Sequence, residues 1–532
     1  MNFFFFCIRK KDAPQVTSEC LDILNDLLRR FCSSLNEKHF QMIVEALIPE
    51  LKGKHQLAKK RTIHCLASIS PFINEELFVK IAEELLQGVK IENNKRTYIQ
   101  AVGILARSVG KRIGVYVDKF SPLLIEAIKS EEDDEDDIKD YALQTFESFL
   151  LNCRENVNEK LFEIILGLVS EKIKYDPNYN EEEDEKDENA SENDEEEFDE
   201  EFDESSQEID DESWKVRKAS AKVFGAAMDS SRSTGEKMDL ANKVFPIFTK
   251  RLSERAETVR LEIYATYVEL LKHLQVLFKS NEDSVRELVK HWTPSIVKQL
   301  SKQLTSKYPK TKIASLQVLK ELLGIYPNVL QEHLAEIINP VIASIGENKN
   351  LLLKIEAITF VRLLCTNNSP KAMVSNVNKF SSSIFESVKS PNVQAATEAL
   401  KVCGEFLKII DSEKPSFDLK NFVQTLRSAV SPQYRANDID FHIKEAAINV
   451  FSLLISKFES MLSEEQLKED LKLLVMKLKN EITRPTSLQS FEMIGSSNIN
   501  QSLILPVLSE IVEELISCLR KASRQLKTGK IF

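Results

Sequence analysis

The sequence predicts an all-α protein: an α-α superhelix, that is, a HEAT- or armadillo-like solenoid of roughly eleven helix pairs with one long acidic disordered loop. Helical segments of one kind recur along the chain, each with a basic residue near its start. Apolar residues in these segments recur at i, i+3, i+4 and i+7, the period of an amphipathic helix. The chain has only 13 Gly and 16 Pro in 532 residues, which disfavours an all-β fold with many turns.

The repeated helix starts give the period of the array. They lie around Arg61, Arg96, Lys139, Arg217, Arg260, Lys312, Lys354, Gln394 and Lys444. Successive starts are 35 to 52 residues apart, except for a step of 78 that falls to 46 when a 32-residue acidic segment is left out. A period near 40 to 47 residues with two helices per unit is typical of HEAT and armadillo repeats.

A second set of amphipathic helices alternates with the first. It comprises Glu37–Lys52, Glu75–Lys90, Val157–Ile173, His333–Glu347 and Leu503–Leu519. Prolines are expected within or near one helix of a pair, where they bend it: Pro49, Pro122, Pro340 and Pro506. Because each pair can bury its apolar face only against its neighbours, the pairs should share one continuous core.

This pattern divides the chain into four parts. Residues 1–13 form a short N-terminal stub outside the repeats, 14–175 are HEAT repeats, 176–213 are the acidic disordered loop, and 214–532 are HEAT repeats again, the last of them truncated. The segment Arg520–Phe532 has the pattern of another repeat helix just beginning. We therefore expect the chain to be a fragment of a longer solenoid.

The segment Glu181–Glu212 holds 21 Asp or Glu among its 32 residues, and one Lys. Such a run repels itself and cannot bury apolar surface, so it is predicted to be solvated and disordered. A second cluster, Glu131–Asp137, is predicted to be a shorter exposed loop. Without the long segment the chain has 70 basic and 62 acidic residues, so the body is mildly basic and can meet an acidic protein surface. The charge of the loop disfavours nucleic acid as a partner.

Sequence signatures of catalysis and of metal binding are missing. There is no P-loop, no GxSxG and no HExxH, and the seven His are isolated. The eight Cys are scattered without a CxxC pair, which predicts buried free thiols of a reducing compartment. No apolar stretch is long enough to cross a bilayer. We expect a soluble, intracellular protein that is not an enzyme and uses no cofactor, metal or membrane.

Four residues directly after the acidic segment are candidates for protein interaction: Trp214, Lys215, Arg217 and Lys218. Trp214 either packs at the start of a repeat helix or anchors a partner. The three cations beside it could tether the acidic loop to the solenoid, an attraction that salt would screen.

A series of short motifs, in order along the chain, resembles the cullin-associated, neddylation-dissociated protein family. The motifs are KKRTI (59–63), KRTYIQ (95–100), GKRIG (110–114), QTFESF (144–149), YDPNYN (175–180), SWKVRKASAK (213–222) and LKNEITRPT (478–486). The acidic segment lies between YDPNYN and SWKVR, and the resemblance runs from about Pro14 to the end.

The resemblance implies an all-HEAT scaffold that binds a cullin and its RING subunit when the cullin does not carry the ubiquitin-like modifier. It also implies regulation of SCF-type ubiquitin ligase assembly by exchange of substrate receptors, action as a monomer within a hetero-complex, and a location in the cytoplasm and the nucleus. The C-terminal part of family members, which competes with the adaptor, is expected to be absent from this chain.

The alternative is an importin-β-type nuclear transport receptor, which can also carry an acidic loop among HEAT repeats. A generic phosphatase-type scaffold explains neither the YDPNYN motif nor the loop.

Overall fold

Many helices begin where the sequence supplies a short polar side chain that can cap them. The computed structural model describes residues 14–130, 136–175, 212–497 and 501–520. At the start of α5 (Glu75–Gly88), the Asn74 side chain accepts a hydrogen bond of 3.0 Å from the Leu77 amide. Equivalent caps are made by Asn36, Asn158, Ser233, Asn350, Asn392, Asp418 and Ser463. These caps satisfy amide donors that the first turn leaves free, so the helix starts are set locally.

The chain forms two units, residues 1–273 and 274–532, and the unit boundary falls within α15 (Glu257–Phe278). The other α-helices of the first unit are α2 (Pro14–Phe31), α3 (Glu37–Leu47), α4 (Gln56–Ile69), α5, α6 (Lys95–Val109), α7 (Lys111–Gly114), α8 (Val117–Lys129), α9 (Asp136–Asn152), α10 (Glu159–Lys172), α13 (Ser213–Ser230) and α14 (Thr234–Lys250). Short 3-10 turns cover Cys32–Ser34, Ile48–Lys52, Glu92–Asn94 and Arg154–Asn156.

The second unit continues the pattern of helix pairs. Its helices are α16 (Glu282–Leu304), α17 (Pro309–Leu323), α18 (Leu334–Ile345), α19 (Leu351–Asn367), α20 (Pro370–Ser387), α21 (Val393–Ser412), α22 (Leu419–Arg435), α23 (Phe441–Lys457), α24 (Glu464–Lys479), α25 (Arg484–Gly495) and α26 (Gln501–Arg520). Two 3-10 turns cover Gln331–His333 and Glu459–Met461. No β-strand occurs among the described residues of either unit.

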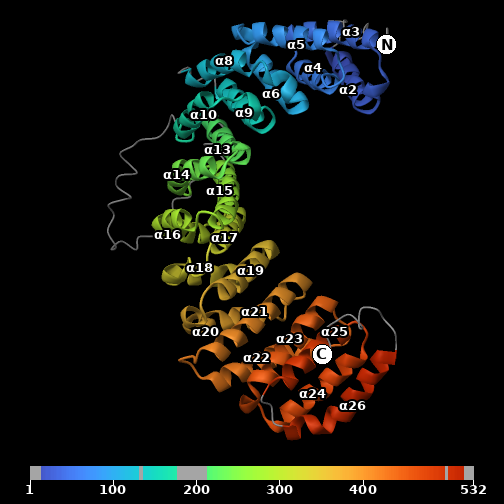
Figure 1. Ribbon diagram of the computed structural model, residues 1–532, viewed down its shortest axis with the longest axis vertical. Helices are drawn as coiled ribbons and strands as arrows, with labels where there is room; N and C mark the ends of the chain where they lie inside the picture. The colour runs from blue at the N-terminus through green and yellow to red at the C-terminus, as the bar shows by residue number, and fades with distance from the viewer. Residues whose placement is uncertain (1–13, 131–135, 176–211, 498–500, 521–532) are drawn as a thin grey trace. The chain divides into compact units, whose positions relative to one another are not determined.

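Within each unit the helices form two rows (Figure 1). The second helix of each repeat packs beside the second helix of the next, and we call these the B row: α2, α4, α6, α9 and α13 in the first unit, and α17, α19, α21, α23 and α25 in the second. The first helices form the A row, in which α16, α18, α20 and α22 follow one another in the second unit. This is the predicted all-α solenoid architecture, in which each repeat buries its apolar face against its neighbours.

Small residues allow neighbouring helices to approach closely, both within the B row and between α5 and α6. A Cβ atom at Gly103 of α6 would lie 2.8 Å from the Thr145 hydroxyl oxygen of α9, and one at Gly88 would lie 2.2 Å from the buried ring of Tyr98. Glycine is therefore needed at both positions for helix packing rather than for backbone conformation.

Several sequence predictions can be compared with the described residues. Helices occupy the expected partner segments, and Pro122, Pro340 and Pro506 lie inside A-row helices. Six of the eight cysteines are buried free thiols: Cys20, Cys32, Cys65, Cys153, Cys365 and Cys403. The N-terminal stub, residues 1–13, and residues 176–211 of the acidic loop lie outside the described residues; of the last two loop residues, Glu212 lies in a turn and Ser213 already begins α13.

The prediction of an exposed loop at Glu131–Asp137 is wrong for its last two residues, and residues 131–135 lie outside the described part. Asp136 and Asp137 form the first turn of α9, and Asp136 is buried. The Asp136 carboxylate can be buried because Lys139 and Tyr175 both donate hydrogen bonds to it. The run of acidic residues in the sequence does not reveal these partners.

Candidate interaction surface beside the acidic segment

A side chain of the first unit joins the described residues on either side of positions 176–211. Tyr175 is the last described residue before positions 176–211, and Glu212, the last residue of the acidic segment, is the first described residue after them. The Arg217 guanidinium of α13 donates to the Tyr175 carbonyl oxygen at 2.9 Å and to the Ser213 hydroxyl at 2.8 Å. One side chain thus joins the chain on both sides of the segment.

Arg217 is buried, with a side chain only 2% exposed. Its guanidinium lies 3.4 Å from the carboxylate of Glu254, which is 1% exposed and also pairs with Arg251. A buried charge is tolerated when it is paired and hydrogen-bonded. Arg217 was a candidate for partner binding, but this geometry gives it a structural role in holding α13, and it presents no surface to a partner.

The position before the acidic segment is held by a second buried group. The Lys139 ammonium of α9 donates to Asp136 at 3.0 Å and to the Tyr175 hydroxyl at 3.3 Å, and it lies 4.9 Å from the centre of the Tyr175 ring. The Tyr175 hydroxyl in turn donates to Asp136 at 3.1 Å. Burial raises the pKa of Tyr175, so the phenol keeps its proton and remains a donor.

The remaining three candidates lie at the surface of α13. Lys215 is 28% exposed and bridges Glu212, at 2.7 Å, and Asp137, at 3.2 Å; Asp137 also pairs with Arg96 at 2.5 Å. Lys218 is about one third exposed and lies 4.0 Å from Glu262. Trp214, the second residue of α13, is half-buried.

Geometry therefore brings Trp214, Lys215 and Lys218 onto one partly exposed turn of α13 beside the acidic segment, whereas Arg217 is buried. Their interaction with a partner stays a prediction. Sequence reasoning missed the structural roles of Asp136, Tyr175 and Glu254. Each of them also has a partner from a neighbouring repeat, 36 to 42 residues away, and the only signal was that Tyr175 opens the YDPNYN motif.

The pKa of one acidic residue next to this turn is shifted. Burial raises the pKa of Asp140 on α9 to about 6, and Asp137 adds to the rise. The Gln144 amide opposes it by donating to both carboxylate oxygens, at 2.9 and 3.0 Å. Asp140 thus changes charge close to neutral pH beside the candidate surface.

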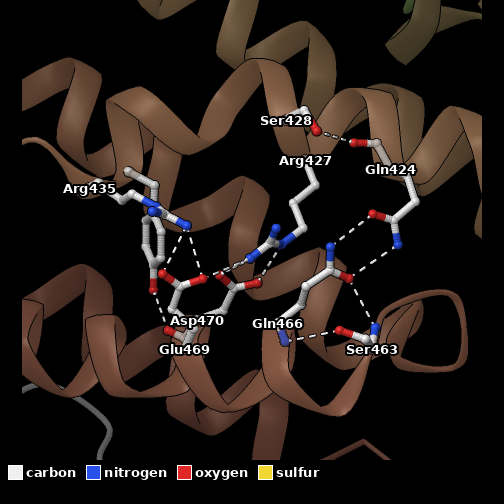
Figure 2. A network of polar contacts seen from close by, with 9 residues as sticks. Gln424, Arg427, Ser428, Arg435, Ser463, Gln466, Glu469 and Asp470 are labelled. Carbon is white, nitrogen blue, oxygen red and sulfur yellow. Dashed lines mark hydrogen bonds and ion pairs between the residues drawn. The ribbon is translucent and has the colours of Figure 1, made fainter.

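The second unit contains a further buried ionic network, between α22 and α24 (Figure 2). The Arg427 guanidinium donates two hydrogen bonds to Asp470, of 2.9 and 2.8 Å, and Asp470 is 1% exposed. Tyr434 donates to the Asp470 carbonyl at 2.9 Å, and Gln424 and Gln466 bond to each other at 3.0 and 3.2 Å. The network joins two successive A-row helices and has a structural role.

Among the described residues, no group of three or more His, Cys, Asp or Glu side chains could hold a metal ion. The helices of the described part include none that is long and apolar enough to span a membrane.

The chain is similar to proteins of one family over almost all of its length. A family model described as "CAND1-like, TPR repeats" matches residues 328–451. "Cullin-associated NEDD8-dissociated protein 1" of Arabidopsis thaliana is 32% identical over 97% of this chain, and that of Dictyostelium discoideum is 33% identical over 98%. "Cullin-associated NEDD8-dissociated protein 2" of Mus musculus is 30% identical over 98%. The chain spans 43% of the length of each of these three relatives.

Two solved structures of nuclear import proteins have a similar fold. A chain from a structure of Kap95p with RanGDP covers 97% of this chain with a TM-score of 0.73 and 9% identity, and 61% of its own length is matched. Importin beta covers 98% of this chain with a TM-score of 0.52 and 12% identity, over 60% of its own length. At these identities the likeness concerns the helical-repeat fold alone.

Proposed function

The chain belongs to the family of cullin-associated NEDD8-dissociated proteins, and from this premise we propose that it is a non-enzymatic scaffold that binds cullin–RING cores. The observation that carries the proposal is the identity of 30–33% to cullin-associated relatives along 97–98% of the chain. A match of this length includes both units and the flanks of the acidic segment. The finer part of the proposal is that binding requires a cullin without the ubiquitin-like modifier and serves the assembly of SCF-type ligases by exchange of substrate receptors.

The architecture supports a binding role of this kind. A solenoid exposes long rows of equivalent helix positions, so a partner can be held by weak contacts spread over many repeats. In the first unit, Trp214, Lys215 and Lys218 lie partly exposed on one turn of α13 next to the acidic segment. We propose that this turn takes part in partner binding, with Trp214 as the apolar contact and the two lysines as the charged ones.

The proposal extends to the protein's partners and location. The chain acts as a monomer in a hetero-complex with a cullin and its RING subunit, without nucleic acid, in the cytoplasm and the nucleus. Six buried free cysteines support a reducing compartment.

Pull-down of a purified cullin–RING core by the full chain tests the proposal. The unmodified core should be retained, and the core that carries the ubiquitin-like modifier should be retained at least tenfold less. The alternative, an importin-β-type receptor, is tested in parallel with a basic cargo peptide with and without Ran. Cargo capture that depends on Ran, with no capture of the unmodified core by a folded chain, would reject the cullin proposal.

A further inference from the structure

The second unit exposes large apolar side chains at or just before the starts of four successive B-row helices. In α19, α21 and α23 the first helical residue is apolar and exposed: Leu351 (42%), Val393 (38%) and Phe441 (38%). Leu352 follows with 68% exposure, and Ile482, two residues before α25, is 56% exposed. We call these five residues the N-terminal row.

These helix starts lie side by side. α19, α21, α23 and α25 pack in sequence within the B row (Figure 1). Thr486, the third residue of α25, donates a hydrogen bond of 3.0 Å to Glu445, the fifth residue of α23. At the other end, Lys457 of α23 pairs with Asp411 of α21 at 3.2 Å. α21, α23 and α25 therefore run parallel with their ends at similar levels, and α19 packs beside α21, so the N-terminal row follows successive helix starts of the unit.

The spacing of the row indicates the shape of its partner. Packed helices are about 8–10 Å apart, so four helix starts extend over roughly 30 Å. An α-helix rises about 10.5 Å in seven residues, and about 20 residues span 30 Å. Apolar residues repeated every seven positions on a partner helix would therefore meet successive members of the row. A β-strand is a poorer fit, because its side chains alternate between two faces.

Charges beside the row differ between its two halves. Lys310, Lys349 and Lys389 are exposed at or before the starts of α17, α19 and α21, and no carboxylate of the described residues forms an ion pair with them. Around the starts of α23 and α25, the exposed charges include the carboxylates of Asp438 and Glu481. A partner segment should therefore be acidic along one half and basic along the other.

We infer that the N-terminal row is a docking site for an amphipathic helix of a partner protein. The helix has apolar residues at seven-residue spacing, acidic residues beside α17–α21, and basic residues beside α23–α25. Helix-in-groove recognition uses such regularly spaced apolar anchors. This goes beyond the proposed function, because it specifies a segment type for the second unit and holds whether or not the partner is a cullin.

The test measures binding of the full chain to a fluorescent synthetic peptide by anisotropy. The probe is a 24-residue helix with leucine at the first and fourth position of each heptad, glutamate in the polar positions of one half and lysine in those of the other. The double variant Leu352→Glu/Phe441→Glu should lower its affinity at least tenfold. Met476→Glu is the matched control, since Met476 is an apolar residue of similar exposure, 57%, on the A-row helix α24, and it should leave the affinity unchanged.

Charge and shape are tested with the same assay. Lys349→Glu with Lys389→Glu should weaken the probe severalfold in low salt and much less in high salt. All variants change exposed side chains, so the thermal unfolding midpoint should stay at that of the parent chain. Absence of probe binding to the parent, equal loss in Met476→Glu, or tighter binding of a proline-rich peptide of the same length would overturn the inference.

Discussion

Replacing Arg427 by Met breaks the buried pair between α22 and α24 while keeping the length of the side chain. The guanidinium is 8% exposed and makes two hydrogen bonds to Asp470, whose carboxylate is 1% exposed. Loss of the cation leaves Asp470 buried and unpaired, which typically costs about 3–5 kcal/mol. The cost should fall on the α22–α24 region, because repeats contact only their neighbours.

This local stability is measured by hydrogen exchange of the full chain, followed in peptides from α22 and α24. A single midpoint of global unfolding is less informative, because a repeat array need not unfold in two states. Because 1.4 kcal/mol corresponds to a tenfold change, a loss of about 3–5 kcal/mol should speed exchange by about 10²- to 4 × 10³-fold. Arg435→Met is the control: it removes a cation from the same helix that is 49% exposed and pairs with Glu469 at 2.9 Å. Loss of an exposed pair should cost less than about 1 kcal/mol.

The pH dependence adds a second signature. Burial already raises the pKa of Asp470, and Arg427 opposes this rise. Without Arg427 the pKa of the folded state rises further above that of the unfolded state. The variant should therefore be weakest at neutral pH and recover as the pH falls through the raised pKa. A loss in Arg427→Met no larger than in Arg435→Met, or a loss that does not change with pH, would refute the reasoning.

Three further changes have expected outcomes. Asp140→Asn should raise the melting temperature at pH 7, because burial raises the pKa of Asp140 to about 6 and its charged form therefore destabilises the folded state. This destabilisation develops as the pH rises from about 4 to 6, so the gain in melting temperature should disappear below pH 4. Gly88→Ala should cost about 1–3 kcal/mol by its clash with Tyr98, whereas Gly167→Ala, with no atom within 4 Å of its added Cβ, should be neutral or stabilising in thermal unfolding. Deletion of 181–211 should leave the melting temperature nearly unchanged, because long surface connections are cheap to alter; a large drop would mean that this segment packs.

Helical periodicity was sufficient to predict the fold class. Positions such as Leu319 and Leu322 of α17 recur on one helix face, and that face is buried as the pattern predicts. Repeat spacing predicted the pairing of each helix with the next because the connections are short. The local rules fail where an interaction joins two repeats.

Arg217 illustrates this failure. On the sequence it is one of three cations beside an acidic run, and a charged residue is normally solvated. In the structure its partners are a carbonyl 42 residues away and a carboxylate on another repeat, and it is buried. The N-terminal row was missed for the opposite reason: each of its residues, such as Val393 or Phe441, fits an ordinary helix start, and only the alignment of neighbouring helices brings them together.

The central claim, that this chain is a cullin-associated scaffold, is tested most directly by the dissociation constant for a cullin–RING core, measured by surface plasmon resonance with the full chain immobilised. The core without the ubiquitin-like modifier should bind at least tenfold more tightly than the modified core, and Trp214→Ala should weaken that binding while leaving the melting temperature within a few degrees. Equal affinity for both cores, or no binding of either by a chain that unfolds cooperatively, would contradict the account.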